Sequence, residues 1–155
     1  MKFAKSKVLT PHKNKIMQRI ALFLVFVSLF TSCRKDDNSD TRSAGVNEYL
    51  DLNLPSFLAL SVPNNYIYFP SGTRGIIIFR KSTTEFLAFE RACPYDAQLA
   101  TGLVSVETTL TSLKDSTCGS RFSLFDGGVI NGPATRPLSQ YRTELLQGNI
   151  LHIFN

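Results

Sequence analysis

The stretch that decides the fold is CGSRFSLFDGGVINGPATRPL, residues 118–138. Within it, residues 121–125 form a strand-like run that stops at Asp126-Gly127-Gly128. An Asp-Gly pair beside such a run is a strong signal for the turn of a β-hairpin, because glycine accepts the backbone angles that a tight turn requires. The stretch therefore predicts a hairpin whose turn contains Asp126, Gly127 and Gly128.

Further strand-like runs lie on both sides of this hairpin. A β-branched run at 75–80 and an apolar run at 85–91 are separated by a polar turn, which predicts a second hairpin. Other strands are expected at 66–69 and at 149–154. Strands at intervals of roughly 8 to 12 residues, with turn residues between them, predict an all-β sandwich or small barrel. Only two short segments hint at helical turns, 58–61 and 97–102.

The residues on both sides of the predicted hairpin turn are similar to the second half of Rieske iron–sulfur domains. Those domains carry a Gly-Ser-x-Phe strand, a Gly-Gly turn and a Gly-Pro-Ala-x-x-Pro-Leu loop, and Ala92-Cys93-Pro94-Tyr95 resembles their first cluster-binding loop. The resemblance covers residues 45–155 and implies a Rieske-like fold of stacked antiparallel sheets. It also implies that Gly132, Pro133 and Ala134 form the loop that shields the cluster in that family, here kept as a packing element.

The residues that would hold the cluster are mostly replaced in this chain. A Rieske centre binds one iron through two cysteines and the other through two histidines, in the pattern Cys-x-His and Cys-x-x-His. Tyr95 stands in place of the first histidine, Asp115 in place of the second cysteine and Cys118 in place of the second histidine. The last histidine of the chain, His152, lies far beyond both loops. Counting imidazoles therefore predicts that no normal Rieske cluster is bound.

The same resemblance implies that the two loops face each other, so that Cys93 and Cys118 point into one small space. We expect a disulfide between them, because residues 1–32 have the pattern of a secretory signal peptide and the secretory route permits oxidation. Such a bond would close a loop of about 25 residues and stabilise the fold by about 3 kcal/mol in the chain-entropy model. Two buried free thiols are the alternative.

A metal at Cys93 and Cys118 is a further alternative. It could be a 2Fe-2S cluster, or a single zinc or iron ion that also uses Asp96 and Asp115, since zinc accepts sulfur and carboxylate ligands. Neither loop contains a close Cys/His pair. We therefore expect no metal and no cofactor.

The first 32 residues are expected to be a signal peptide. Residues 1–19 contain six basic residues and no acid, and residues 20–30 are apolar except for Ser28. A basic segment, a short apolar core and small residues in that order are typical of a secretory signal. As a helix this core is about 16 Å long, half the thickness of a bilayer's hydrocarbon layer, so it is too short to span a membrane. Met17 begins an equally complete signal and is an alternative start.

The segment Leu29-Phe30-Thr31-Ser32-Cys33 resembles a lipobox, in which the cysteine is lipidated and becomes the new N-terminus. Three acyl chains, at about 0.8 kcal/mol per buried CH₂, would hold the protein on a bilayer. Residues 34–37, Arg-Lys-Asp-Asp, resemble a signal that exports some Gram-negative lipoproteins to the outer face of the outer membrane; a solvated spacer is the alternative. Residues 33–46 are expected to be a lipidated tether and residues 47–155 the folded domain.

The charge and the histidine content of the mature chain limit the functions that it can have. Six of the 17 lysines and arginines precede Cys33 and all 12 acids follow it, so the mature chain has 11 basic against 12 acidic residues, a net charge of −1. This balance argues against nucleic-acid binding. The mature chain has a single histidine, His152, which cannot supply the usual triads of nucleophilic catalysis. We therefore expect a non-catalytic structural or binding module, held on a membrane through Cys33, with electron transfer at Cys93 and Cys118 as the alternative.

Overall fold

The computed structural model describes residues 45–155, in which ten β-strands and one short 3-10 helix are present. The predicted signal peptide, Cys33 and the predicted tether up to residue 44 lie outside the described residues. Every strand pair is antiparallel. The expected all-β class with antiparallel sheets is therefore confirmed. Within residues 45–155, none of the helical structure has the length and apolar character needed to cross a bilayer.

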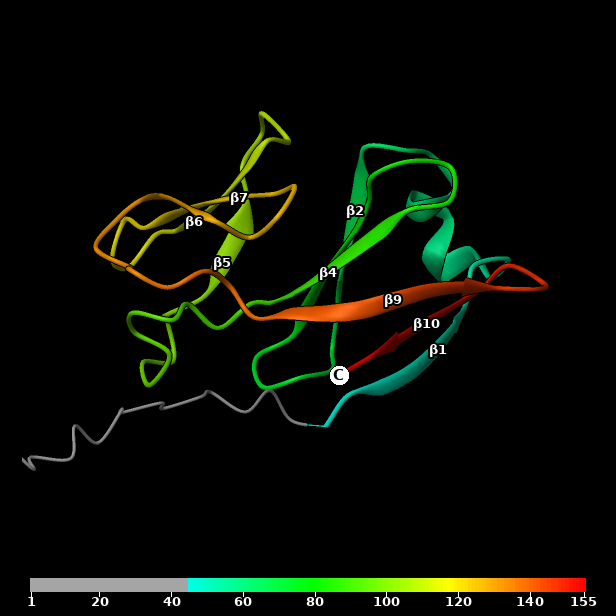
Figure 1. Cartoon of the computed structure of the whole chain (residues 1–155), viewed down its shortest axis with the longest axis horizontal. Coiled ribbons are helices and arrows are strands. Elements are labelled where there is room, and N and C mark those ends of the chain that lie inside the picture. The colour runs from blue at the N-terminus through cyan, green and yellow to red at the C-terminus, as the bar shows by residue number, and fades with distance from the viewer. Residues whose placement is uncertain (1–44) are drawn as a thin grey trace, which may run out of the picture. The chain divides into compact units, whose positions relative to one another are not determined.

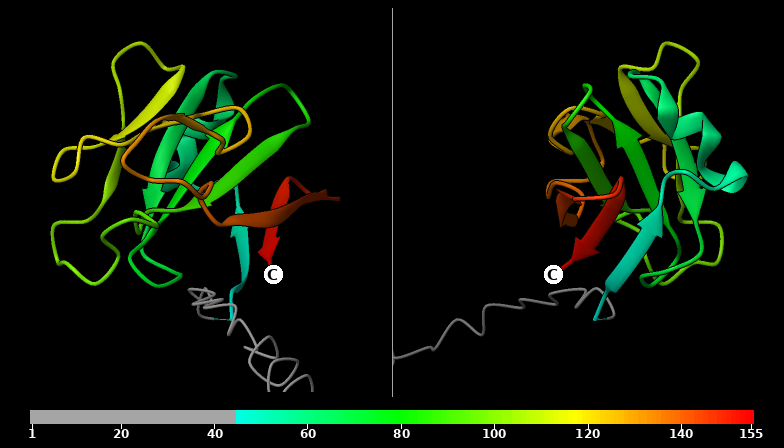
Figure 2. Two further views of the ribbon diagram at one scale, coloured as in Figure 1. Left: turned by 60° about the vertical axis from the view of Figure 1, so that its left-hand side comes forward. Right: turned by 90° about the vertical axis from the view of Figure 1, so that its right-hand side faces the viewer.

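The larger sheet has six strands in the order β1-β10-β9-β4-β3-β2 (Figure 1). Its first and last strands in the sequence pair with each other, with Asn47 opposite Phe154, so the two ends of the described chain lie side by side (Figure 2). A 3-10 helix, Pro55–Ser61, connects β1 to β2 and contains the residues 58–61 that were expected to form a helical turn. The strands of this sheet are β1 (Asn47–Asp51), β2 (Asn65–Phe69), β3 (Ile76–Arg80), β4 (Phe86–Glu90), β9 (Gln140–Leu146) and β10 (Ile150–Phe154).

The smaller sheet is inserted in the sequence between β4 and β9. It has four strands in the order β5-β6-β7-β8. Figure 1 shows it beside the end of the larger sheet from which the chain leaves β4 and enters β9. The strands of this sheet are β5 (Val104–Val106), β6 (Ser112–Asp115), β7 (Arg121–Ser123) and β8 (Val129–Asn131).

Strands β3 and β4 are buried on both faces, which explains their unbroken apolar sequences. Successive side chains of a strand point to opposite faces. Ile76 and Ile78 therefore join a first core with Leu60 of the 3-10 helix, Leu151 of β10 and other residues. The alternate residues of β3 and β4 join a second core with side chains of the smaller sheet; they are Ile77, Phe79, Leu87 and Phe89.

Both predicted hairpins are present. Strands β3 and β4 pair in a register that places Ile78 opposite Ala88. Strands β7 and β8 pair around the predicted turn, where Gly127 has a φ of 72° and the Asp126 carboxylate accepts a 3.0 Å hydrogen bond from the Gly128 amide.

Three expectations about local structure are corrected. Strand β7 ends at Ser123 rather than at residue 125, because the Gly127 amide already donates to the Ser123 carbonyl and closes the turn. Residues 97–102 contain separate turns and no helix, since the amides of Leu99 and Gly102 donate to carbonyls three residues earlier without a continuous ladder. Val46, assigned to the tether, is buried, and its amide donates to the Asn155 side chain.

The buried carboxylate of Glu90, at the end of β4, holds the chain in place where the loop after β4 begins. It accepts hydrogen bonds from the amides of Thr73, Arg74 and Ala92 at 2.7, 2.9 and 3.1 Å. The Tyr141 hydroxyl donates a further bond at 2.8 Å. Glu90 thus connects the turn before β3, the loop after β4 and strand β9 at one point.

Candidate functional site

The first loop follows β4 and carries Cys93 and Asp96. The Cys93 amide donates to the Gly102 carbonyl at 3.1 Å, and Ala92 forms an isolated antiparallel bridge with Leu103, so the loop is closed at its base. A Cβ atom at Gly102 would collide with the backbone of Asp96. The absence of a side chain at Gly102 therefore lets Asp96 lie against the loop base.

The second loop is the tight connection between β6 and β7, and it carries Asp115 and Cys118. The Asp115 amide donates to the Ser120 carbonyl, and the Gly119 amide, at a φ of 80°, donates back to the Asp115 carbonyl. The Asp115 carboxylate accepts a 2.6 Å bond from the Thr117 amide. Thr117 also joins the two loops, because its hydroxyl donates to the Thr101 carbonyl at 2.8 Å.

Four side chains from the two loops meet in one cluster: Cys93, Asp96, Asp115 and Cys118. One potential ligand atom from each lies within 4.8 Å of the others. The two Sγ atoms are 3.7 Å apart. Cys93 and Asp115 are fully buried and Asp96 is 7% exposed. The structure therefore places together the four residues considered for a metal from the sequence.

Three carboxylate oxygens of this cluster are buried without a hydrogen-bond partner. They are both oxygens of Asp96 and the Oδ2 atom of Asp115. Burial of a polar group costs free energy unless a partner replaces the lost water, and most buried polar groups in folded proteins have one. The cluster thus holds acceptor capacity that the protein itself leaves unused.

Burial and mutual proximity shift the titration of two groups in the cluster. Burial raises the pKa of the Cys93 thiol, and the neighbouring carboxylates of Asp115 and Asp96 raise it further. Burial also raises the pKa of Asp96; the Asp115 carboxylate adds to this rise, whereas the neighbouring Cys93 thiol opposes it. Each shift stabilises the protonated form of the group relative to the same group in water.

The predicted shielding loop lies next to Cys118 and is linked to it by Ser120. The Ala134 amide and the Cys118 thiol both donate to the Ser120 hydroxyl oxygen, at 2.9 and 3.0 Å. Ala134 is buried in the second core with Cys93, and Gly132 and Pro133 lead into it. Ser120 is fully buried and connects the second loop to the shielding loop.

Both cysteines are free thiols in this structure, so the predicted disulfide is not present. Their sulfur atoms are 3.7 Å apart, whereas a disulfide bond is about 2.05 Å long. The expected proximity of Cys93 and Cys118 is nevertheless found. The structure differs from the expected disulfide in one further respect: the buried carboxylates of Asp96 and Asp115 lie beside the two sulfur atoms. The positions of the cysteines in the sequence do not show this.

The remaining positions compared with the Rieske pattern lie outside the cluster. Tyr95, at the position of the first histidine, is 60% exposed. His152 lies in β10, where its ring stacks on Tyr49 and Phe154 with centroid distances of 4.2 and 4.4 Å. Its Nε2 atom is 2.8 Å from the side-chain oxygen of Asn47. No imidazole of residues 45–155 therefore contributes to the cluster.

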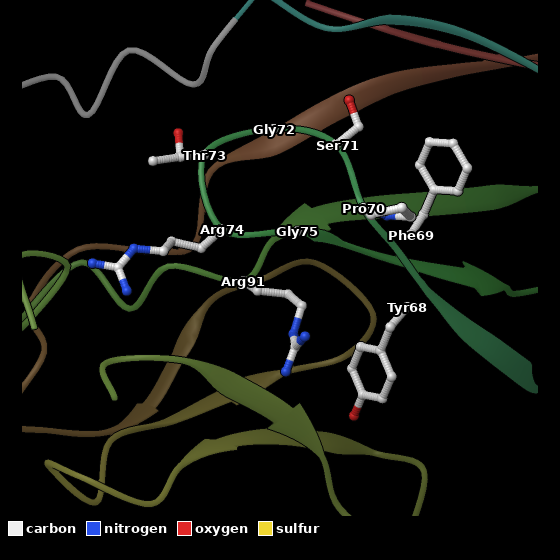
Figure 3. Close-up of a pocket in the computed structure, with 9 residues that line it drawn as sticks. All are labelled: Tyr68, Phe69, Pro70, Ser71, Gly72, Thr73, Arg74, Gly75 and Arg91. Carbon is white, nitrogen blue, oxygen red and sulfur yellow. The ribbon is translucent and has the colours of Figure 1, made fainter. Parts of the chain in front are cut away.

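A separate surface pocket of about 390 Å³ lies along residues 68–75, at the end of β2 and in the turn before β3, beside Arg91 (Figure 3). Its two guanidinium groups already have protein partners. Arg91 lies over the Tyr68 ring at 4.3 Å from the centroid, and Arg74 donates to the Ala97 carbonyl at 3.1 Å. We assign no chemistry to this pocket, because its cationic side chains serve to join this segment to its surroundings.

Comparison with known proteins gives little further information. No family model and no curated protein matches the chain. One similar solved structure is described as a complex of reduced oxygenase and oxidized ferredoxin in carbazole 1,9a-dioxygenase. The match has 16% sequence identity and a TM-score of 0.47, and it covers 71% of this chain and 92% of that chain. The chemistry of the site in this chain is set by its own side chains.

Proposed function

We propose that the chain is a lipoprotein of a Gram-negative cell envelope whose Rieske-like β domain holds no 2Fe-2S cluster. The domain acts as a non-catalytic structural or binding module. A lipid on Cys33 attaches it to a membrane, and the segment Arg34-Lys35-Asp36-Asp37 directs it to the outer membrane. The anchoring part of this proposal is supported by the order of basic, apolar and small residues before Cys33.

The observation that carries the functional part is the composition of the four-residue cluster. A Rieske centre requires two imidazoles on one iron. Two cysteines and two aspartates lie between the two loops. Tyr95 is exposed and His152 stacks on Tyr49, so neither side chain belongs to this cluster. Electron transfer through a Rieske-type cluster is therefore disfavoured. His152, the single histidine of residues 45–155, stacks on Tyr49 and Phe154 and contacts the Asn47 side chain, which is not the arrangement of a Ser/His or Cys/His pair.

The proposal is tested on the full chain, produced anaerobically in an iron-replete Gram-negative host and extracted from membranes with detergent. We expect colourless protein that gives no rhombic paramagnetic signal after reduction. Its intact mass should correspond to a chain that begins at Cys33 and carries three acyl groups. The variant Cys33→Ala should leave the membrane fraction. A rhombic two-iron signal would refute the absence of a cluster, and an unlipidated mass would refute the anchor.

A further inference from the structure

We propose that Cys93, Asp96, Asp115 and Cys118 bind a single divalent transition-metal ion, for which zinc is the best fit. The inference goes beyond the proposed function and depends on it at one point only, which is that no two-iron cluster fills the same space. The ion would bridge the loop after β4 and the loop between β6 and β7.

The sulfur–sulfur distance in the cluster agrees with tetrahedral coordination of zinc. One ligand atom from each of the four residues lies within 4.8 Å of the others. Two thiolates bound to zinc at about 2.3 Å lie about 3.8 Å apart when the coordination is tetrahedral. The Cys93 and Cys118 sulfur atoms are 3.7 Å apart. The sulfur pair therefore already has the separation that a shared zinc ion imposes.

The unpartnered carboxylate oxygens point independently to a cation. Asp96 is 7% exposed and neither of its oxygens has a hydrogen-bond partner, and the Oδ2 atom of the fully buried Asp115 also has none. A bound cation supplies the electrostatic partner that these oxygens lack. The proposal thus accounts for three orphaned acceptors that the protein alone leaves unexplained.

The donor set selects the kind of ion. Magnesium and calcium prefer oxygen ligands only, and thiolates select against them. Two sulfur and two carboxylate ligands in a small tetrahedral space suit zinc, with cobalt(II) as its spectroscopic substitute. Four protein ligands close the coordination sphere, which is typical of structural rather than catalytic zinc sites.

Metal binding changes the protonation and the net charge of the site. Both thiols release a proton to solvent as they coordinate the ion, so four anionic ligands surround a divalent charge and the site carries a net charge of −2. Three backbone amides point at ligand atoms of the site. The amides of Thr117 and Cys118 donate to the Asp115 Oδ1 atom at 2.6 and 3.4 Å, and the Ser120 amide points at the Cys118 sulfur at 3.5 Å. Hydrogen bonds of this kind orient metal ligands.

The test uses the full chain, reduced, stripped with a chelator and then titrated with zinc chloride or cobalt chloride. We expect one ion per chain after gel filtration and a higher unfolding temperature with zinc than without it. Cobalt should give a thiolate charge-transfer band and the intense visible bands of tetrahedral coordination. Loss of both bands in the double variant Cys93→Ser, Cys118→Ser would assign the sulfur ligands.

The matched carboxylate variants are Asp96→Asn and Asp126→Asn. Asp126 is an exposed turn residue outside the cluster. Asp96→Asn should weaken zinc binding at least about 10-fold, because losing a ligand costs no less than losing a residue that supports one. Asp126→Asn should bind zinc like the wild type. Equal affinity in both variants would overturn the assignment of Asp96.

Two further outcomes overturn the proposal as a whole. One is reduced protein with both thiols titratable that takes up no metal. The other is protein isolated without reductant that has no titratable thiol and no metal, which would assign a Cys93–Cys118 disulfide instead. Bound iron with a rhombic paramagnetic signal would refute the proposed function, whereas zinc bound through two sulfur atoms would leave it intact.

Discussion

At the scale of single residues, Glu90 shows how one buried charge positions the site. Its two oxygens accept four hydrogen bonds, three from backbone amides and one from the Tyr141 hydroxyl. Hydrogen bonds to a charged group each contribute about 1.5–3 kcal/mol. One of them belongs to Ala92, the residue before Cys93, so Glu90 sets where the first loop leaves β4.

The variant Glu90→Gln should therefore lower the free energy of unfolding by about 2–4 kcal/mol, because an amide nitrogen would face backbone donors. Tyr141→Phe removes a single donor and should cost about 1–2 kcal/mol. Urea unfolding followed by circular dichroism measures both. Glu85→Gln is the control, since Glu85 forms an exposed ion pair with Lys81 and such pairs contribute about 0–1 kcal/mol. Equal losses in Glu90→Gln and Glu85→Gln would contradict the role of Glu90.

The sequence discloses the identities of the cluster residues but not their hydrogen bonds. Cys93 and Cys118 could be paired through the resemblance of their loops to a known pattern, and Asp96 and Asp115 could be named as possible ligands. Ser120 lies in the Gly-Ser-x-Phe motif, which does not reveal its bonds to Cys118 and Ala134, and Glu90 carries no signal, because a glutamate at a strand end is common on surfaces. Their roles follow from burial, which depends on how the two sheets pack.

At the scale of elements, the β7–β8 hairpin depends on Gly127 in two ways. Its φ of 72° lies in the left-handed region, and a Cβ atom there would lie 2.9 Å from the Phe89 ring. Gly148 lies between β9 and β10 with a φ of 77°, and a Cβ atom there would meet nothing within 4 Å. The two glycines share the backbone requirement and differ in the space around them.

Alanine substitutions at these two positions therefore separate backbone strain from packing. Gly148→Ala should cost about 1–2 kcal/mol, the penalty of a left-handed conformation for a residue with a Cβ atom. Gly127→Ala should cost about 1–3 kcal/mol more, because the new methyl group displaces Phe89 from the second core. Thermal unfolding of both variants gives the difference. Equal destabilisation would show that Phe89 yields without cost.

Elements with strong local patterns were predictable, including the three-residue strand β7, and elements without such patterns were not. The apolar runs of β3 and β4 and the Asp126-Gly127 turn each carry their signal within a few residues. Strands β5 and β8 are three residues long and exist because neighbouring strands pair with them. Strand β9 mixes exposed polar residues with the buried Tyr141, so its apolar pattern is weak. Long-range pairing, which no local window contains, determines these strands.

At the scale of the whole described domain, two cores share the strands β3 and β4. Leu151 belongs to the first core and Leu124 to the second, and both are fully buried. The side chains of β3 contact one core at alternate positions and the other core at the positions between. Loss of packing on one face of β3 should therefore loosen the strand that supports the other face.

This coupling predicts that the domain unfolds as one cooperative unit. Leu151→Ala and Leu124→Ala should each lower the free energy of unfolding by about 2–5 kcal/mol, the usual cost of a large cavity in a core. Native-state hydrogen exchange resolves where the loss occurs. In both variants, amides of β10 and amides of β6 should lose protection by comparable amounts, because both report the same global opening. Faster exchange confined to the smaller sheet in Leu124→Ala would show instead that the second core opens alone, and that the two loops bearing Cys93 and Cys118 can separate while the larger sheet stays folded.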